Sequence, residues 1–200
     1  MDYAHSLRQR IEAGDVLVGI IGVGYVGLPL ALAFVERGFT VVGFDVDPVK
    51  VDKLSRGEGY IKHLDGGRIA AAVATGRLLA TTDFSRLSEP DAVLICVPTP
   101  LTPQREPDMT YIERSAQQVK ATLRPGQLVI LESTTYPGTT DELLRRILEE
   151  TGLRCGGDFF LAFSPEREDP GNKDYGTTTT PKVVGGVDVV SGDLAQALYD

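Results

Sequence analysis

The sequence predicts a doubly wound α/β fold, in which a mostly parallel sheet carries helices on both faces. Two observations lead to this prediction. Apolar runs of strand length alternate with segments of helical pattern along most of the 200 residues, the order typical of parallel strands joined by right-handed crossovers. The spacing G-x-G-x-x-G also lies between the first apolar run and the first helical segment, where a Rossmann-like fold places a tight turn.

The first apolar stretch, residues 16–35, contains no charged side chain. It is long enough to cross a bilayer, so a membrane span has to be considered. Four glycines and Pro29 interrupt the stretch, and glycine and proline are the residues that most often end regular structure. We therefore interpret it as a strand over 16–21, a turn, and a helix over 28–37.

Three glycines indicate that the turn binds a nucleotide. Gly22 permits a sharp turn off the strand, Gly24 lets a pyrophosphate approach the backbone, and Gly27 lets the helix pack close to the sheet. The phosphates would lie on unpaired N–H groups at the helix start. Asp45 follows the next apolar run, 40–44, at eighteen residues from Gly27. A carboxylate there accepts from ribose hydroxyls and repels a 2′-phosphate, so the sequence predicts NAD as the cofactor rather than NADP.

The remaining elements alternate in the same way. We expect residues 1–15 to form a polar lead-in, with a short helix, and 16–200 to form one domain. Helices are predicted from residue 48 and over 68–75, 110–123, 140–150 and 191–200. Strands are predicted over 40–44, 78–82, 91–97, 127–131, 159–163 and 182–185. Residues 57–67 and 133–138 are predicted loops, and three prolines exclude regular structure from 99–109.

Composition excludes several functional classes. The formal net charge is −8 and no basic run occurs, so nucleic-acid binding is not expected. The N-terminus lacks the pattern of a signal peptide, and a cytoplasmic location without a membrane span is expected. Cys96 and Cys155 are too far apart for a predicted metal or disulfide pair. His5 and His63 lie near neither cysteine in sequence, so no metal site is predicted.

Polar residues follow almost every predicted strand. In a doubly wound sheet, ligands bind beyond the carboxyl ends of the strands, so these segments are expected to face one crevice. The segments after the glycine turn are Asp45, 97–100, 132–135 and 164–167. Their hydroxyls can hold a ribose or orient a water molecule, and their carboxylates can act as bases.

Several motifs occur together and in a characteristic order. They are GVGYVGLPLA, Asp45, ICVPTPLT, STTYPGTT, SPEREDPGN and PKVVGG. In this set and order the sequence resembles the UDP-glucose/GDP-mannose dehydrogenase family, the NAD-dependent nucleotide-sugar 6-dehydrogenases, over residues 16–186. The SPEREDPGN segment is most similar to the branch that makes UDP-N-acetylglucosaminuronate for surface polysaccharides.

The resemblance implies a reaction and a set of site residues. Members of the family oxidise the C6 alcohol of a UDP-sugar twice, through a cysteine-bound thiohemiacetal and a thioester, and reduce two NAD. Thr134 matches a threonine that orients the catalytic water, and Glu166 matches a carboxylate proposed to assist thioester hydrolysis. The implied cofactor-binding residues are Gly22, Gly24, Tyr25, Val26, Gly27, Asp45, Lys50, Val97, Pro98, Thr99, Ser133 and Thr134.

The family's nucleophile has no counterpart here. That cysteine lies in a G-x-C-x-x-K-D context, which neither Cys96 nor Cys155 matches. We therefore expect residues 1–200 to be the cofactor half of a longer enzyme, able to bind NAD without completing the oxidation. Family members dimerise through a central helix, which implies a homodimer or larger assembly for the full-length protein.

Other functions are compatible with parts of this pattern. UDP-N-acetylmannosamine and UDP-glucose are alternative substrates. A regulatory module that binds NAD without chemistry would keep the glycine turn and make Thr134 and Glu166 dispensable. A methyltransferase also places glycines after its first strand and an acid after its second, but the complete G-x-G-x-x-G spacing argues against it.

Overall fold

One sheet of seven strands organises the chain in this computed structural model, which describes residues 2–62, 64–165 and 181–200. The strands lie in the order β3-β2-β1-β4-β5-β6-β7. All neighbouring pairs are parallel except β6 and β7, which are antiparallel. The strands are β1 (Leu17–Ile21), β2 (Thr40–Phe44), β3 (Leu78–Thr81), β4 (Ala92–Ile95), β5 (Leu128–Leu131), β6 (Phe160–Phe163) and β7 (Gly185–Gly186). The predicted doubly wound, Rossmann-like fold is confirmed.

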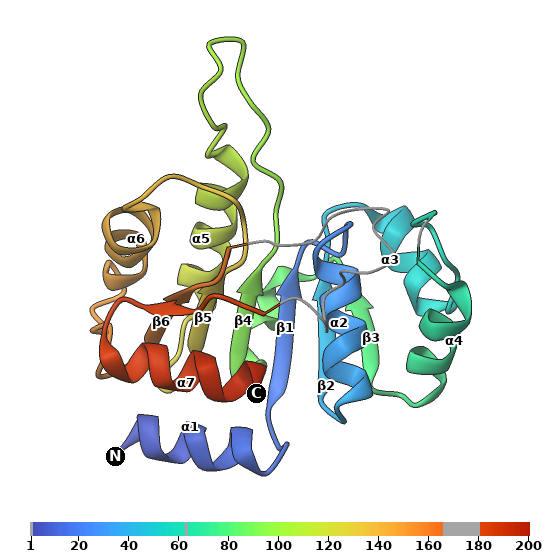
Figure 1. Cartoon of the computed structure of the whole chain (residues 1–200), viewed down its shortest axis with the longest axis horizontal. Coiled ribbons are helices and arrows are strands. Elements are labelled where there is room, and N and C mark those ends of the chain that lie inside the picture. The colour runs from blue at the N-terminus through green and yellow to red at the C-terminus, as the bar shows by residue number, and fades with distance from the viewer. Residues whose placement is uncertain (1, 63, 166–180) are drawn as a thin grey trace.

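Helices cover both faces of the sheet (Figure 1). One face carries α2 (Gly27–Glu36), α3 (Pro48–Ser55), α4 (Gly66–Ala74) and α7 (Val189–Tyr199), with α1 (Tyr3–Glu12) packed beneath α7. The other face carries the 3₁₀ helix η1 (Phe84–Ser88), α5 (Thr110–Thr122), η2 (Thr139–Leu144) and α6 (Arg145–Glu149). The chain order reverses between β1 and β4, which is where such folds open a crevice.

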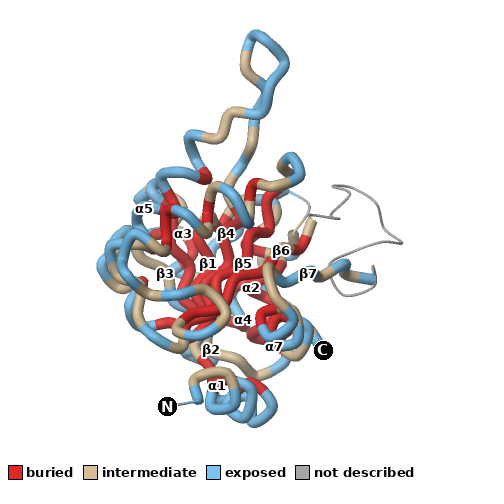
Figure 2. Tube along the Cα trace, turned by 90° about the vertical axis from the view of Figure 1, so that its left-hand side faces the viewer, coloured by how far each residue is buried: buried red, intermediate tan, exposed pale blue. Residues whose placement is uncertain are grey.

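The core consists of two apolar clusters, one on each side of the sheet. Neighbouring residues of a strand point to opposite faces, so Leu94 packs in the cluster beneath α2 and α7 while Ile95 packs in the cluster beneath α5. Both side chains are fully buried. Figure 2 shows the same distribution, with buried residues concentrated in the strands. A strand buried on both faces is therefore a continuous apolar run, as the sequence shows for residues 92–95.

The stretch 16–35 is not a membrane helix. It forms β1, the glycine turn and most of α2, and α2 is ten residues long. No helix in the described ranges has the length and apolar character that crossing a membrane requires.

Two predicted elements differ in detail, and one element was not predicted. The helix predicted over 140–150 begins as the π-helix η2 and continues as the short α6. The strand predicted over 182–185 is reduced to β7, two exposed glycines at the sheet edge, and it runs antiparallel to β6. Residues 84–88, for which no element was predicted, form η1, capped by Asp83.

Residues 99–109 form an arm that extends away from the sheet (Figure 1). The predicted absence of regular strand or helix holds apart from one isolated bridge between Leu101 and Pro107. Two backbone hydrogen bonds, from Thr102 to Glu106 and from Asp108 to Pro100, close the arm as a narrow hairpin.

Candidate functional site

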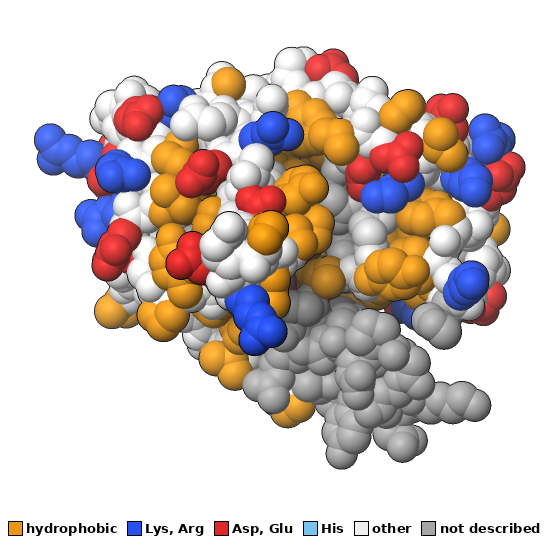
Figure 3. Space-filling view, turned by 90° about the horizontal axis from the view of Figure 1, so that it is seen from above, with side chains coloured by type: hydrophobic (Ala, Val, Ile, Leu, Met, Phe, Trp, Pro, Cys, Tyr) orange, Lys and Arg blue, Asp and Glu red, His pale blue; other side chains and the backbone are white. Residues whose placement is uncertain are grey.

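A cleft of about 1120 Å³ opens at the carboxyl ends of β1, β2 and β4. Figure 3 looks down on this end of the molecule and shows apolar side chains gathered around the middle of the face. Phe44, Phe84, Val97 and Ile147 contribute to its walls. A concave, mainly apolar cleft with a few polar groups is the usual form of a small-molecule site.

The glycine turn forms one wall of the cleft, and each glycine meets a different steric demand. Gly22 has a φ of +90°, and a Cβ there would lie 2.6 Å from the carbonyl oxygen of Cys96. A Cβ on Gly27 would lie 1.9 Å from the carbonyl oxygen of Gly22. At Gly24, by contrast, a Cβ would have no protein atom within 4 Å and would project into open space. Gly24 thus keeps the turn free for a ligand.

The same turn presents unused hydrogen-bond donors. The N–H groups of Gly24, Tyr25 and Val26 donate to no acceptor in the described part of the chain, and no side chain caps the start of α2. Unpaired N–H groups and the helix macrodipole both favour an anion here. A diphosphate fits this cradle. Tyr60 stabilises the turn, because its hydroxyl donates to the carbonyl oxygen of Val23 at 2.6 Å.

Asp45 lies next to the turn, at the end of β2, and is only 6% exposed. Its carboxylate accepts from the N–H of Val23 at 3.1 Å and from the N–H of Asp47 at 3.0 Å. Lys50 Nζ lies 3.3 Å from the same group. An ionised carboxylate has about four acceptor positions, so one position remains for a hydroxyl donor from the cleft.

Hydrogen bonds join the ends of β4 and β5. Ser133 Oγ donates to the carbonyl oxygen of Val97 at 2.7 Å, and Thr99 Oγ1 donates to the carbonyl oxygen of Thr134 at 2.6 Å. Val97 is itself a wall residue of the cleft. The hydroxyls of Ser133 and Thr99 therefore fix these two segments against each other at the cleft edge.

The structure brings most of the expected site residues together. Those that line the cleft are Gly22, Gly24, Tyr25, Val26, Asp45, Lys50, Val97 and Pro98. Gly27 is buried beneath the turn, and Thr99, Ser133 and Thr134 lie beside the cleft through the hydrogen bonds just described. Glu166 lies outside the described residues. Their roles toward a cofactor remain predictions.

Some residues of the site were not predicted. Tyr60 lies in a segment that the sequence marks only as a loop, and Tyr111 and Arg114 of α5 line the cleft. Glu132 was predicted, as part of segment 132–135, to face the crevice. That prediction is wrong for Glu132, which follows β5, is fully buried and is paired with Lys182. A glutamate and a lysine fifty residues apart carry no local signal of pairing; only the apolar strand before Glu132 indicates its burial.

The chemistry of the cysteines differs from that of a nucleophile. Cys96 is buried at the end of β4. Burial and the nearby Asp188 raise the pKa of the Cys155 thiol to about 11, which disfavours the reactive thiolate. Among the described residues, no group of three or more His, Cys, Asp or Glu side chains is arranged to hold a metal ion.

Comparison with known proteins agrees with this site. Residues 16–200 match the family model described as the UDP-glucose/GDP-mannose dehydrogenase family, NAD binding domain. A UDP-N-acetyl-D-mannosamine dehydrogenase from Pyrococcus horikoshii is 36% identical over 183 residues, covering 91% of this chain and 44% of the relative. A UDP-N-acetyl-D-glucosamine 6-dehydrogenase from Pseudomonas aeruginosa is 35% identical, covering 92% of this chain and 43% of the relative. The chain thus spans less than half the length of these relatives.

Solved structures lead to the same family. The crystal structure of an NDP-N-acetyl-D-galactosaminuronic acid dehydrogenase from Methanosarcina mazei superposes with a TM-score of 0.89 at 36% identity, covering 100% of this chain and 44% of that protein. A GDP-mannose dehydrogenase from Pseudomonas aeruginosa superposes with a TM-score of 0.83 at 32% identity, covering 91% of this chain and 43% of that protein. With the glycine cradle, the cleft and the family match in agreement, this chain belongs to the UDP-glucose/GDP-mannose dehydrogenase family, of which it is the NAD-binding domain.

Proposed function

We propose that residues 1–200 provide the NAD site of a nucleotide-sugar 6-dehydrogenase, an enzyme that oxidises the C6 hydroxyl of a UDP-sugar to a uronate with two NAD. The observation that carries the proposal is the cradle at the start of α2. Its N–H groups, which have no acceptor among the described residues, and the open space at Gly24 face the cleft, which Asp45, the residue after β2, also lines. This geometry supports a dinucleotide that lies across the sheet.

Each part of the cleft has a distinct task in this proposal. The N–H groups of the turn hold the diphosphate, and Asp45 accepts from the adenosine ribose while Lys50 stays beside it. Ser133, Thr99 and Thr134 form the edge at β4 and β5, near the nicotinamide end. When bound, NAD supplies the hydride acceptor for alcohol oxidation. The role of Thr134 in orienting water, and that of Glu166 in hydrolysis, rest on the family resemblance.

The substrate we propose is UDP-N-acetylglucosamine, on the basis of the SPEREDPGN segment. UDP-N-acetylmannosamine is the alternative, because the Pyrococcus relative is named for that sugar and is 36% identical to this chain, close to the 35% of the relative named for UDP-N-acetylglucosamine. UDP-glucose is another, since a UDP-glucose dehydrogenase from Pyrobaculum islandicum has a TM-score of 0.79. We also propose that the full-length protein is cytoplasmic and, by the family resemblance, at least dimeric.

Calorimetric titration of the chain with NAD and NADP tests the proposal. We expect saturable NAD binding, weaker NADP binding, and loss of the preference in Asp45→Asn, because the neutral amide no longer repels a 2′-phosphate. With this chain alone the three UDP-sugars should yield no uronate, since the thioester step requires a cysteine and neither Cys96 nor Cys155 matches the nucleophile. Absence of NAD binding contradicts the proposed cofactor role, and uronate formation by the chain contradicts its expected incompleteness.

A further inference from the structure

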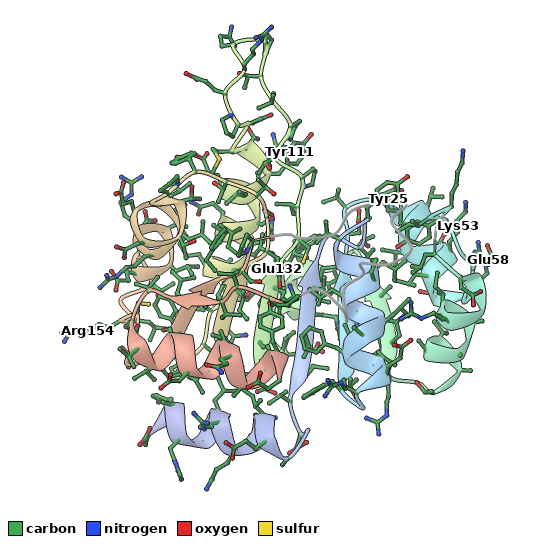
Figure 4. The ribbon with its side chains drawn as sticks, in the orientation of Figure 1. Tyr25, Lys53, Glu58, Tyr111, Glu132 and Arg154 are labelled. Carbon is green, nitrogen blue, oxygen red and sulfur yellow. The ribbon has the colours of Figure 1, made fainter. Side chains whose placement is uncertain are left out.

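A charged cluster around the buried Glu132 lies at the ends of β5 and β6. Glu132, with a fully buried side chain, accepts from Lys182 Nζ at 2.8 and 2.9 Å. Lys182 also lies 3.4 Å from Ser164 Oγ, and the Tyr199 hydroxyl donates to Glu132. Figure 4 shows Glu132 in the interior, below the level of Tyr25 and Tyr111. We call Glu132, Ser164, Lys182 and Tyr199 the Glu132 cluster; Glu132 and Ser164 are buried, and Lys182 and Tyr199 are partly buried.

The cluster joins segments that are distant in sequence. Glu132 is the first residue after β5, Ser164 is the first after β6, Lys182 precedes β7, and Tyr199 ends α7. Lys182 Nζ also lies 4.7 Å from the centre of the Tyr199 ring. Burial, together with the neighbouring Glu132 carboxylate, raises the pKa of Tyr199 well above its usual value, which keeps the phenol a donor. The position of the β5 end is therefore fixed from three other elements.

Glu132 of this cluster is adjacent in sequence to the residues at the cleft edge. Glu132 is followed by Ser133, which donates to the carbonyl oxygen of Val97, and then by Thr134, whose carbonyl oxygen accepts from Thr99. Glu132 N–H itself donates to the carbonyl oxygen of Ile95, which extends the ladder between β4 and β5 by one residue. A shift of the Glu132 carboxylate would move the Ser133–Thr134 segment relative to Val97.

The sheet order assigns this edge to one end of a dinucleotide. The glycine turn on β1 lies between Asp45 on β2 and the β4 and β5 ends. Neighbouring strands are about 4.8 Å apart, so β2 and β5 are separated by roughly 14 Å. With the adenosine ribose at Asp45 and the diphosphate at the turn, the nicotinamide half extends toward Thr99 and Ser133. On the basis of the proposed function, we infer that Glu132 and Lys182 are positioning residues for the nicotinamide half of NAD.

A binding comparison separates positioning from folding. ADP-ribose keeps the adenosine and the diphosphate but lacks nicotinamide. Glu132→Gln and Lys182→Met should raise the Kd for NAD about tenfold, the effect of about one charge-assisted hydrogen bond, and leave the Kd for ADP-ribose within about twofold. Lys182→Arg keeps the cation, so its Kd for NAD should stay close to that of the unsubstituted chain, unlike that of Lys182→Met. Among the described residues, the double substitution Glu132→Gln/Lys182→Met removes both charges of the pair together, so it provides a second variant if a single substitution does not fold.

Asp91→Asn is the matched control. Asp91 is also a carboxylate that is buried and paired with a cation, but it precedes β4 at the opposite end of the sheet. It should change neither Kd. The inference is overturned if Glu132→Gln weakens NAD and ADP-ribose equally, or if it weakens neither. If the unsubstituted chain binds neither ligand, the proposed cofactor role fails instead.

Discussion

Arg10 donates to both carboxylate oxygens of Asp91, at 2.6 and 2.8 Å, across 81 positions of sequence. Asp91 is 5% exposed. It also accepts from the N–H of Leu17 at 3.0 Å and from Arg124 at 2.9 Å. One buried carboxylate thus joins α1, the start of β1 and the segment before β5 at the amino ends of the strands.

Removal of this carboxylate should destabilise the fold. Asp91→Ala leaves the guanidinium groups of Arg10 and Arg124 without their shared partner. Because these two side chains are 43% and 37% exposed, water can partly replace the carboxylate, and the expected cost is about 1–3 kcal/mol. Urea unfolding measures the change. Glu12→Ala breaks an ion pair with Arg8 on the exposed side of α1 and should cost less than about 1 kcal/mol. An equal decrease in unfolding free energy in Asp91→Ala and Glu12→Ala would contradict the structural role of Asp91.

The contribution of Asp91 should also depend on pH. Burial alone would raise the pKa of Asp91, but hydrogen bonds from Arg10, the Leu17 N–H and Arg124 outweigh it, and the pKa lies below its usual value. In the unfolded chain the carboxyl group of an aspartate has a pKa of about 3.9. Its stabilisation is therefore fully present above that pH and is lost as pH falls through the lower, folded pKa. The difference in unfolding free energy between the unsubstituted chain and Asp91→Asn should shrink below about pH 4. A difference independent of pH would count against this account.

The N-terminal helix provides a separate test. The sequence marks residues 1–15 as a lead-in, yet Leu7 and Ile11 are buried in the core cluster and α1 packs against α7. Deletion of residues 2–14 should lower the unfolding free energy by about 3–6 kcal/mol through loss of the two buried aliphatic side chains, in addition to the effect of losing the Arg10 contact. A deleted chain as stable as the original would make 1–15 the separable segment that the sequence predicts.

The elements that the sequence predicts well are those with a strong local signal. β4 is a run of apolar residues between a polar and a proline-rich segment. α2 follows a glycine turn whose spacing, between an apolar run and a helical segment, is typical of the first turn of a Rossmann-like fold. Asp45 is predictable because it combines a strand end with a fixed distance from Gly27. In each case the information lies within about twenty residues of chain.

The features that were missed depend on distant contacts. The π-helix η2 follows Gly138, whose φ is +94°, and a helical periodicity does not separate a π turn from an α turn. The Glu132–Lys182 pair and the Tyr60 bond to Val23 require knowledge of which segments meet. The length of β7 is set by its antiparallel contact with β6, and the sequence of the edge carries no such signal.

Two glycines of the turn should respond differently to the same substitution. Gly24→Ala adds a Cβ with no protein atom within 4 Å, so the melting temperature should not change. That Cβ occupies the space where a diphosphate would meet the backbone, and the Kd for NAD should rise about tenfold or more, as expected for loss of a charge-assisted hydrogen bond.

Gly27→Ala is the matched comparison. Its Cβ would lie 1.9 Å from the Gly22 carbonyl oxygen, and relief of that overlap must shift α2, at a cost of about 2–3 kcal/mol. Thermal unfolding and NAD titration of both variants check the pair. A Gly24→Ala protein that binds NAD normally would show that the diphosphate does not lie on this turn.

Cys155 should react slowly with thiol reagents. Burial and the Asp188 carboxylate, 4.0 Å from Sγ, raise its pKa to about 11, whereas a free thiol titrates near about 8.5. At pH 8 the thiolate fraction is then roughly one in a thousand, and alkylation of the folded chain should be at least about 100-fold slower than that of the urea-unfolded chain. Mass spectrometry of iodoacetamide-treated protein separates Cys155 from Cys96. Asp188→Asn removes one of the charges that hold the proton on sulfur, so it should speed Cys155 alkylation and leave Cys96 unchanged. Rapid modification of Cys155 in the unsubstituted folded chain would reopen the question of whether this thiol takes part in the chemistry.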